Sequence, residues 1–195
     1  EPMTLGYLSV ITRGKGLDLL IEALRVLRDE QGRPVRLRIA GKALNPRYWA
    51  EIRRTIARQS LGAQIDVLGE IDFDAKLALL RGCAAICVPS RLAESRGIVA
   101  LEAMACATPV VLPDSGIFPE IRAVTGAGEL FTAGDPRSLA AACARILDDP
   151  EGARATARAG LAGLATHFSA ARMAGDILDA CALVMRDAAD PAAIP

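Results

Sequence analysis

The feature that most constrains the fold of this chain is an alternation of short apolar segments with longer amphipathic ones. Residues 5–11 are rich in β-forming side chains, and residues 17–27 place leucine and isoleucine at helical spacing. The same alternation then recurs along the chain. Strands that alternate with helices favour a parallel sheet covered by helices on both faces. The sequence therefore predicts an α/β fold with a Rossmann-like, doubly wound parallel sheet.

The apolar pattern also gives the approximate position of each element. We expect strands over residues 5–11, 35–40, 65–68, 84–88 and 110–112, and helices over residues 17–27, 48–56, 73–81 and 98–105. Two Asp-Pro pairs and Ser169 are placed to cap three further helices near the C-terminus. We assign residues 1–186 to one domain and expect a flexible tail over residues 187–195.

Composition and charge exclude several classes of protein. The 23 basic and 23 acidic side chains cancel, and no basic cluster is present that could follow a nucleic-acid backbone, so no nucleic-acid partner is expected. No apolar run is long enough to span a bilayer, and a cytoplasmic protein is expected. The cysteines have no metal-site spacing and are interpreted as small core residues in a reducing compartment. They are Cys83, Cys87, Cys106, Cys143 and Cys181.

Ligands of doubly wound sheets bind beyond the carboxyl ends of the strands, which directs attention to the loops there. After the first predicted strand, Arg13-Gly14-Lys15-Gly16 precedes a helix. Two cations beside the amides of a helix N-terminus favour an anion such as phosphate. The alternative interpretation is a turn with two solvated basic side chains.

The loop after the fourth predicted strand carries a pair of glutamates. Seven residues separate Glu94, in the loop, from Glu102, in the following helix. A carboxylate can accept two hydrogen bonds from a vicinal diol of ribose or hexose, and Gly97 allows a ligand to approach the backbone closely. This pattern suits a nucleotide sugar, although two ordinary surface carboxylates would produce the same spacing.

The wider context favours the first interpretation. Glu94-x7-Glu102 with the helix Leu101-Glu102-Ala103-Met104-Ala105 resembles the retaining GT-B glycosyltransferases of family 4. Further matching motifs occur in the family's order, over roughly residues 5 to 170. They are Lys15-Gly16-Leu17, Ala40-Gly41, Val67-Leu68-Gly69, Pro89-Ser90, Thr108-Pro109-Val110-Val111 and Pro119-Glu120.

The resemblance implies the C-terminal, nucleotide-sugar-binding domain of such an enzyme and assigns a role to each matching residue. It places Glu94 at the donor sugar as the catalytic residue and Glu102 on the ribose. Lys15, helped by Arg13, would bind the diphosphate. The remaining donor-binding positions are Gly97, Ile98 and Val99 at the sugar and phosphates, and Leu68 and Gly69 at the base.

The implied reaction is transfer of a sugar from a UDP- or GDP-sugar to a saccharide or lipid acceptor, with retention and without metal or another cofactor. An N-terminal acceptor domain would be missing, and this chain alone would be inactive. We expect possible self-association through the exposed domain face, and contact with the membrane periphery through the missing domain. The alternatives are a degenerate, non-catalytic module that binds sugar nucleotides or serves assembly, and a nucleotide-sugar epimerase, against which the Glu-x7-Glu segment argues.

The chain departs from the family pattern at three positions. The family has an Arg five or six residues before the Lys, where this chain has Val10 or Ser9. One diphosphate cation is therefore missing unless Arg13 compensates for it. Arg96 replaces a frequent aromatic residue and is expected to tune donor choice, whereas Ala107 replaces a glycine and is interpreted as a packing difference.

Overall fold

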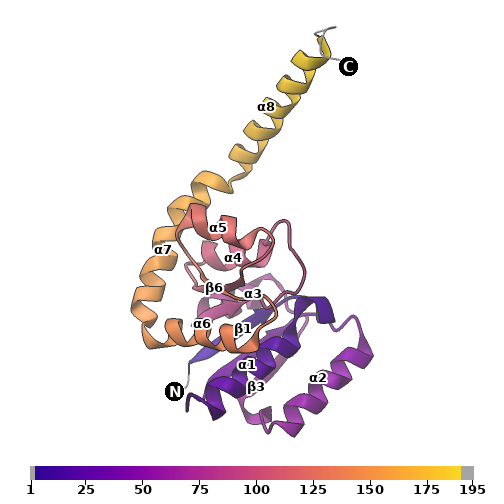
Figure 1. Ribbon diagram of the computed structural model, residues 1–195, viewed down its shortest axis with the longest axis vertical. Helices are drawn as coiled ribbons and strands as arrows, with labels where there is room; N and C mark the ends of the chain where they lie inside the picture. Colours follow the sequence, from indigo (N-terminus) through magenta and orange to yellow (C-terminus); the bar gives the residue numbers. More distant parts are fainter. Residues whose placement is uncertain (1–2, 190–195) are drawn as a thin grey trace.

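The computed structural model describes residues 3–189 and contains a six-stranded parallel sheet (Figure 1). The strand order is β3-β2-β1-β4-β5-β6. The strands are β1 Thr4–Leu8, β2 Arg36–Ala40, β3 Ile65–Gly69, β4 Ala85–Cys87, β5 Val110–Pro113 and β6 Glu129–Phe131. The order reverses between β1 and β4, which is the switch point at which doubly wound sheets bind ligands. The predicted fold class is confirmed.

Helices cover both faces of this sheet. The buried side chains of α1, α2 and α6 form one apolar cluster with one face, and those of α3, α4 and α5 form a second cluster with the other face. Helix α7 packs against α4, α5 and α6. The helices are α1 Leu17–Asp29, α2 Pro46–Arg58, α3 Phe73–Gly82, α4 Ile98–Ala105, α5 Phe118–Thr125, α6 Pro136–Asp148, α7 Pro150–His167 and α8 Ala170–Ala189.

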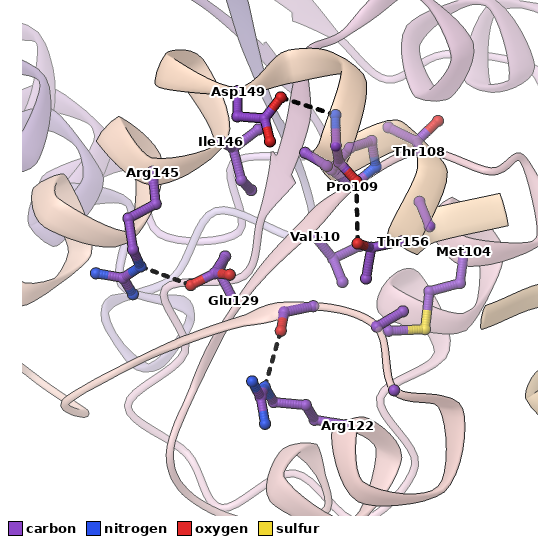
Figure 2. A pocket seen from close by; sticks show the side chains of 16 residues that line it. Met104, Thr108, Pro109, Val110, Arg122, Glu129, Arg145, Ile146, Asp149 and Thr156 are labelled. Carbon is purple, nitrogen blue, oxygen red and sulfur yellow. Dashed lines mark hydrogen bonds and ion pairs between the residues drawn. The ribbon is translucent and has the colours of Figure 1, made fainter. Parts of the chain in front are cut away.

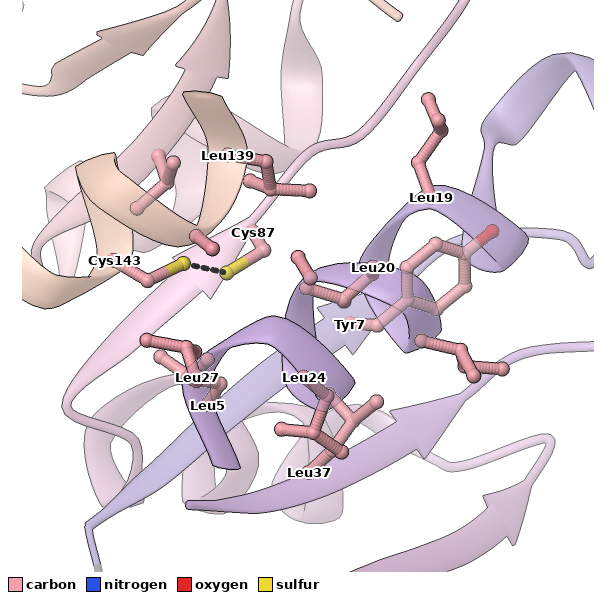
Figure 3. Packing of buried hydrophobic residues seen from close by; sticks show 14 of the residues in the cluster. Leu5, Tyr7, Leu19, Leu20, Leu24, Leu27, Leu37, Cys87, Leu139 and Cys143 are labelled. Carbon is pink, nitrogen blue, oxygen red and sulfur yellow. Dashed lines mark hydrogen bonds between the residues drawn. The ribbon is translucent and has the colours of Figure 1, made fainter. Parts of the chain in front are cut away.

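The first cluster fixes α1 over the centre of the sheet (Figure 3). Leu20, Leu24 and Leu27 are buried against strand residues such as Leu37. Burial of each leucine contributes about 1.5–3 kcal/mol. Because α1 is held along its length, the loop that leads into it from β1 has a defined position.

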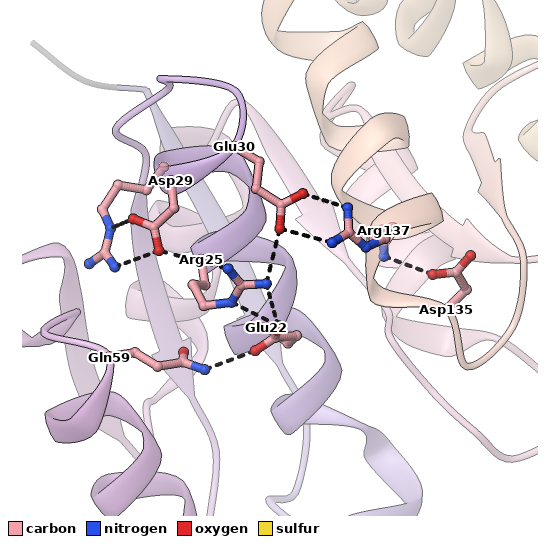
Figure 4. A network of polar contacts seen from close by, with 8 residues as sticks. Glu22, Arg25, Asp29, Glu30, Gln59, Asp135 and Arg137 are labelled. Atoms are coloured by element: carbon pink, nitrogen blue, oxygen red, sulfur yellow. Dashed lines mark hydrogen bonds and ion pairs between the residues drawn. The ribbon is translucent and has the colours of Figure 1, made fainter.

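Polar contacts join the ends of α1 and α6 at the surface (Figure 4). Arg137 donates to Glu30 from Nη1 at 2.5 Å and from Nη2 at 3.1 Å, and Arg25 donates to Glu30 at 3.1 Å and to Glu22 at 2.7 Å. Exposed ion pairs of this kind contribute about 0–1 kcal/mol each. The apolar cluster therefore holds α6 on the sheet, and the ion pairs help to fix the orientation of α6 relative to α1.

Several element boundaries differ from the prediction. Strand β1 ends at Leu8, and Ile11 forms only an isolated bridge with Ala43. Helix α5 and strand β6 were not predicted. Strand β6 has only 3 residues, too few to establish an alternating pattern, and it follows the positive-φ residues Gly126 and Gly128.

The C-terminal region contains the three helices that the sequence predicts. Ser169 accepts a hydrogen bond from the Arg172 amide at 3.2 Å, which confirms the predicted cap of α8. Helix α8 continues to Ala189, into the segment expected to be a flexible tail, and residues 190–195 lie outside the described residues. The interpretation of all cysteines as core residues is wrong for Cys181, which is exposed on α8 because that helix leaves the body of the domain.

Helix α8 projects away from the sheet and its covering helices (Figure 1). Its exposed apolar side chains are Met173, Ile177, Leu178, Leu183, Val184 and Met185. Among the helices of residues 3–189, none combines the length and the apolar character needed to cross a membrane.

Candidate donor site

Two loops meet at the carboxyl edge of the sheet, one after β1 and one after β4. The Arg91 amide donates to the Gly14 carbonyl at 2.8 Å. Gly16 has φ +68°, and a Cβ there would lie 1.9 Å from the carbonyl oxygen of Pro89. Only a glycine therefore allows this contact between the loops. It brings the basic loop of residues 13–16 beside the loop that carries Glu94.

A small hollow lies between these loops, with a volume of about 30 Å³. Inside it, Lys15 Nζ donates to Glu94 Oε1 at 2.8 Å, with 25% and 19% of the two side chains exposed. The Glu94 carbonyl accepts a hydrogen bond from the Ile117 amide at 2.8 Å. The hollow thus presents a cation and a carboxylate, each accessible enough to exchange its partner for a ligand.

Helix α4 begins at the wall of the same hollow. Gly97, with φ +60°, precedes its first turn, and a Cβ there would lie 2.9 Å from Ile121 Cδ1. Gly97, Val99 and Ala100 line the hollow. The unpaired amides of a helix N-terminus favour an anion, so α4 and Lys15 present positive potential to the same space.

A larger hollow of about 330 Å³ adjoins the first, and Leu8, Ser9 and Val99 line both. Glu102 lines the larger hollow and accepts from Lys76 Nζ at 2.7 Å. A second pair at its rim joins Lys42 Nζ to Glu70 Oε1 at 3.2 Å. Glu102 therefore lies in the wider hollow that adjoins the one with the Lys15–Glu94 pair.

The structure brings some of the predicted site residues together and leaves others aside. Lys15, Glu94, Gly97, Val99 and Glu102 line the adjoining hollows. Of the predicted donor residues, Arg13, Leu68, Gly69 and Ile98 line neither of them.

Arg13 is turned toward α2. Its Nη2 lies 2.5 Å from Glu51 Oε2, and its guanidinium carbon lies 5.0 Å from the centre of the Tyr48 ring. In this arrangement the Arg13 guanidinium lies against α2, outside both hollows.

Two lysines of the larger hollow were not identified from the sequence. Lys76 lies on α3 and Lys42 follows β2. A single lysine on an amphipathic helix has the pattern of a solvated face, so no local signal distinguishes Lys76. Lys42 follows the Ala40-Gly41 motif, and its place after a strand end was the only available signal.

An ion pair beside the small hollow perturbs the ionisation of Asp18. Burial alone would raise the pKa of this carboxyl, but hydrogen bonds from Arg91 and Tyr48 outweigh burial and lower the pKa below its ordinary value of 3.8. Arg91 donates to both carboxylate oxygens at 2.7 Å, and Tyr48 Oη donates at 2.7 Å.

Asp18→Asn is expected to lower the free energy of unfolding by about 1 kcal/mol at neutral pH, because the charge-assisted hydrogen bonds are lost. A carboxyl with a lowered pKa stabilises the folded state above its unfolded-state pKa, and this contribution disappears as pH falls through the folded pKa. The difference between wild type and variant should therefore shrink below about pH 4. Urea denaturation across this range would measure it, and a difference that stays constant with pH would contradict the interpretation.

A third hollow, of about 210 Å³, lies at the opposite edge, where β5 and β6 begin (Figure 2). Its charged side chains are engaged by the protein. Arg145 Nε donates to Glu129 at 2.7 Å, Arg122 Nε donates to the Gly128 carbonyl at 3.0 Å, and Asp149 caps α7. This edge is not where parallel sheets bind ligands, and we assign the hollow no role.

Known proteins of one family are similar to this chain in sequence. Residues 1–162 match the family model "Glycosyl transferases group 1". The D-inositol 3-phosphate glycosyltransferase of Jonesia denitrificans is 30% identical over 167 residues, which are 84% of this chain and 39% of that protein. The corresponding enzyme of Segniliparus rotundus is 36% identical over 76% of this chain and 33% of that protein. The chain thus spans well under half the length of these relatives.

Solved structures show the same fold. HepE of Anabaena, solved in complex with UDP and glucose, superposes with a TM-score of 0.81 at 25% identity, over 93% of this chain and 48% of that one. The C-terminal domain of the group 1 family protein LpcC from Francisella tularensis superposes with a TM-score of 0.75 at 24% identity, over 86% of this chain and 87% of that one. The chain belongs to the glycosyl transferases group 1 and forms a domain of the GT-B fold.

Proposed function

We propose that this domain binds a UDP- or GDP-sugar and contributes the donor side of a retaining glycosyl transfer to a saccharide or lipid acceptor. The observation that carries the proposal is the pair of adjoining hollows at the switch point, with Lys15 and Glu94 in one and Glu102 in the other. Structures of HepE with UDP and with UDP-glucose support a nucleotide sugar as the ligand.

Each part of the donor has a complementary group in this arrangement. Glu102 would accept hydrogen bonds from the ribose diol in the larger hollow. The loop at Leu68 and Gly69 would border the base. Lys15 and the first amides of α4 would hold the diphosphate, which gains negative charge as the bond to the sugar breaks. Glu94, beside Lys15, would face the transferred sugar and stabilise positive charge on it.

Binding would release Lys15 from Glu94, since both groups are needed by different parts of the donor. The pair is about one-fifth to one-quarter exposed, so separating it exchanges one charge-assisted hydrogen bond for another with phosphate. The site is proposed to act without metal, which agrees with the presence of Lys15 and a helix N-terminus as electrostatic stabilisers.

Catalysis would require an acceptor-binding domain opposite this one, because orientation of both substrates supplies much of the rate. We therefore propose that the 195-residue chain transfers no sugar by itself.

The exposed apolar face of α8 would favour self-association of the chain when no partner domain covers it. Light scattering should show species larger than monomer at high concentration, and a monomer throughout would contradict this.

Calorimetric titration of the chain with UDP, GDP and ADP tests the proposal. Saturable binding of UDP or GDP is expected. Lys15→Met should lower the affinity for that nucleoside diphosphate by about tenfold to a hundredfold, because one charge-assisted hydrogen bond is lost. The affinity for the corresponding nucleoside should not change. Arg154→Met, which removes an exposed cation from α7 outside both hollows, serves as the control and should leave binding unchanged. Absence of binding to every nucleotide would favour the degenerate, non-catalytic module.

A further inference from the structure

A set of contacts between α1, α2 and the loop after β4 lies next to the small hollow without lining it. Arg91 forms two parallel hydrogen bonds with Asp18, from Nη1 and Nη2, each at 2.7 Å. Arg91 Nη1 also donates to the Arg13 carbonyl at 3.1 Å. A planar guanidinium that makes bonds in these directions has little freedom to rotate.

Asp18 is held in turn by Tyr48 of α2. Tyr48 Oη donates to Asp18 Oδ1 at 2.7 Å, and the Asp18 amide donates to Tyr48 Oη at 3.3 Å. Tyr48 is only 3% exposed, so its position is set by the packing of α2. The orientation of Arg91 therefore depends on a rigid part of the domain core.

These bonds act on the two loops that carry the charged residues of the small hollow. The Arg91 side chain donates a hydrogen bond to the Arg13 carbonyl, and the Arg91 backbone amide donates one to the Gly14 carbonyl. Both carbonyls belong to the loop that carries Lys15. Arg91 also belongs to the loop that continues to Glu94. The contacts thus lie a few residues before both members of the Lys15–Glu94 pair.

We propose that Arg91, Asp18 and Tyr48 are positioning residues for the diphosphate site, and that they set the place of Lys15 relative to Glu94 and the start of α4. This inference rests on the proposed donor function. None of the three side chains lines a hollow at the switch point. Their effect on a ligand must therefore pass through Lys15. Substitutions at these residues should weaken binding only when Lys15 is present.

The test is a double-mutant cycle on UDP binding, or on GDP binding if GDP is the tighter ligand, measured by calorimetry. In the otherwise unaltered chain, Arg91→Met is expected to lower the affinity for the nucleoside diphosphate by about tenfold. In the Lys15→Met background the same change should cost less than about twofold, because Lys15 no longer needs to be positioned. Nucleoside affinity should not change in either case.

Two further variants separate positioning from general stability. Tyr48→Phe removes one hydroxyl and retains the buried ring, and it should weaken diphosphate binding in the same direction as Arg91→Met. Arg137→Met removes an equally close Arg–carboxylate contact, with Glu30 at the other end of α1, and should leave binding unchanged. Circular dichroism would show that each variant is folded at the temperature of the titration.

Different failures have different meanings. If the unaltered chain binds no nucleoside diphosphate, both the donor function and this inference are wrong. If it binds but Arg91→Met binds equally well, or loses the same factor with and without Lys15, the positioning role alone is overturned.

Discussion

Replacing Glu102 with alanine is expected to weaken nucleoside diphosphate binding by at least about a hundredfold. The carboxylate is proposed to accept two hydrogen bonds from the ribose diol, each worth about 1.5 kcal/mol, and their loss corresponds to roughly two orders of magnitude in affinity. The substitution also leaves Lys76 without its partner at 2.7 Å. Calorimetry with the nucleotide that the unaltered chain binds most tightly measures the effect.

Two controls make the result specific. Glu102→Gln retains the shape of the side chain and removes its charge, so an intermediate loss is expected. Glu151→Ala removes an exposed glutamate from the first turn of α7, on the far side of the domain, and should have no effect. A loss of less than about threefold for Glu102→Ala would remove this residue from the donor site.

A large loss of stability is expected for Gly16→Ala. The added Cβ would lie 1.9 Å from the Pro89 carbonyl oxygen, and the backbone must also keep a φ of +68°. Because the neighbour is backbone, it cannot move without displacing the loop after β4. We expect a loss of about 3 kcal/mol or more, a fall in Tm of roughly 10 °C, and weaker nucleotide binding because Lys15 adjoins the displaced segment.

Gly32→Ala provides a matched control that measures the cost of a positive φ alone. Gly32 has φ +65°, almost the same as Gly16, but a Cβ there would meet nothing within 4 Å. This variant should lose only about 1 kcal/mol, the cost of the left-handed conformation alone. Equal losses in thermal denaturation of the two variants would show that the close approach of the loops contributes nothing.

The sequence predicted an element well where a start signal precedes a mainly apolar segment. Helix α4 was predicted over residues 98–105, as observed, because Gly97 marks its start and its residues other than Glu102 are apolar. The end of β1 was misplaced because Val10 and Ile11 are β-forming residues outside the ladder. Strand β6 was missed since so short a segment is ordered by its neighbour β5, to which it pairs, rather than by its own pattern.

The site was predictable only in part. Spacing and motif identified Lys15, Glu94 and Glu102, which the structure places in adjoining hollows. The partner of Glu102 was not predictable, because Lys76 comes from α3 and meets Glu102 of α4 through the packing of these two helices. The same holds for Arg13, whose contacts with α2 depend on how that helix covers the sheet.

Binding of a nucleotide at the carboxyl edge of this sheet can be observed by NMR, through amide chemical-shift mapping during titration with UDP or GDP. We expect the shifts to concentrate at Gly16, Gly97 and Ile98, with smaller changes near Ser9, and amides at residues 126–129 of the opposite edge to stay unchanged. Shifts centred on the opposite edge, or no shifts with any nucleoside diphosphate, would contradict binding at the carboxyl edge.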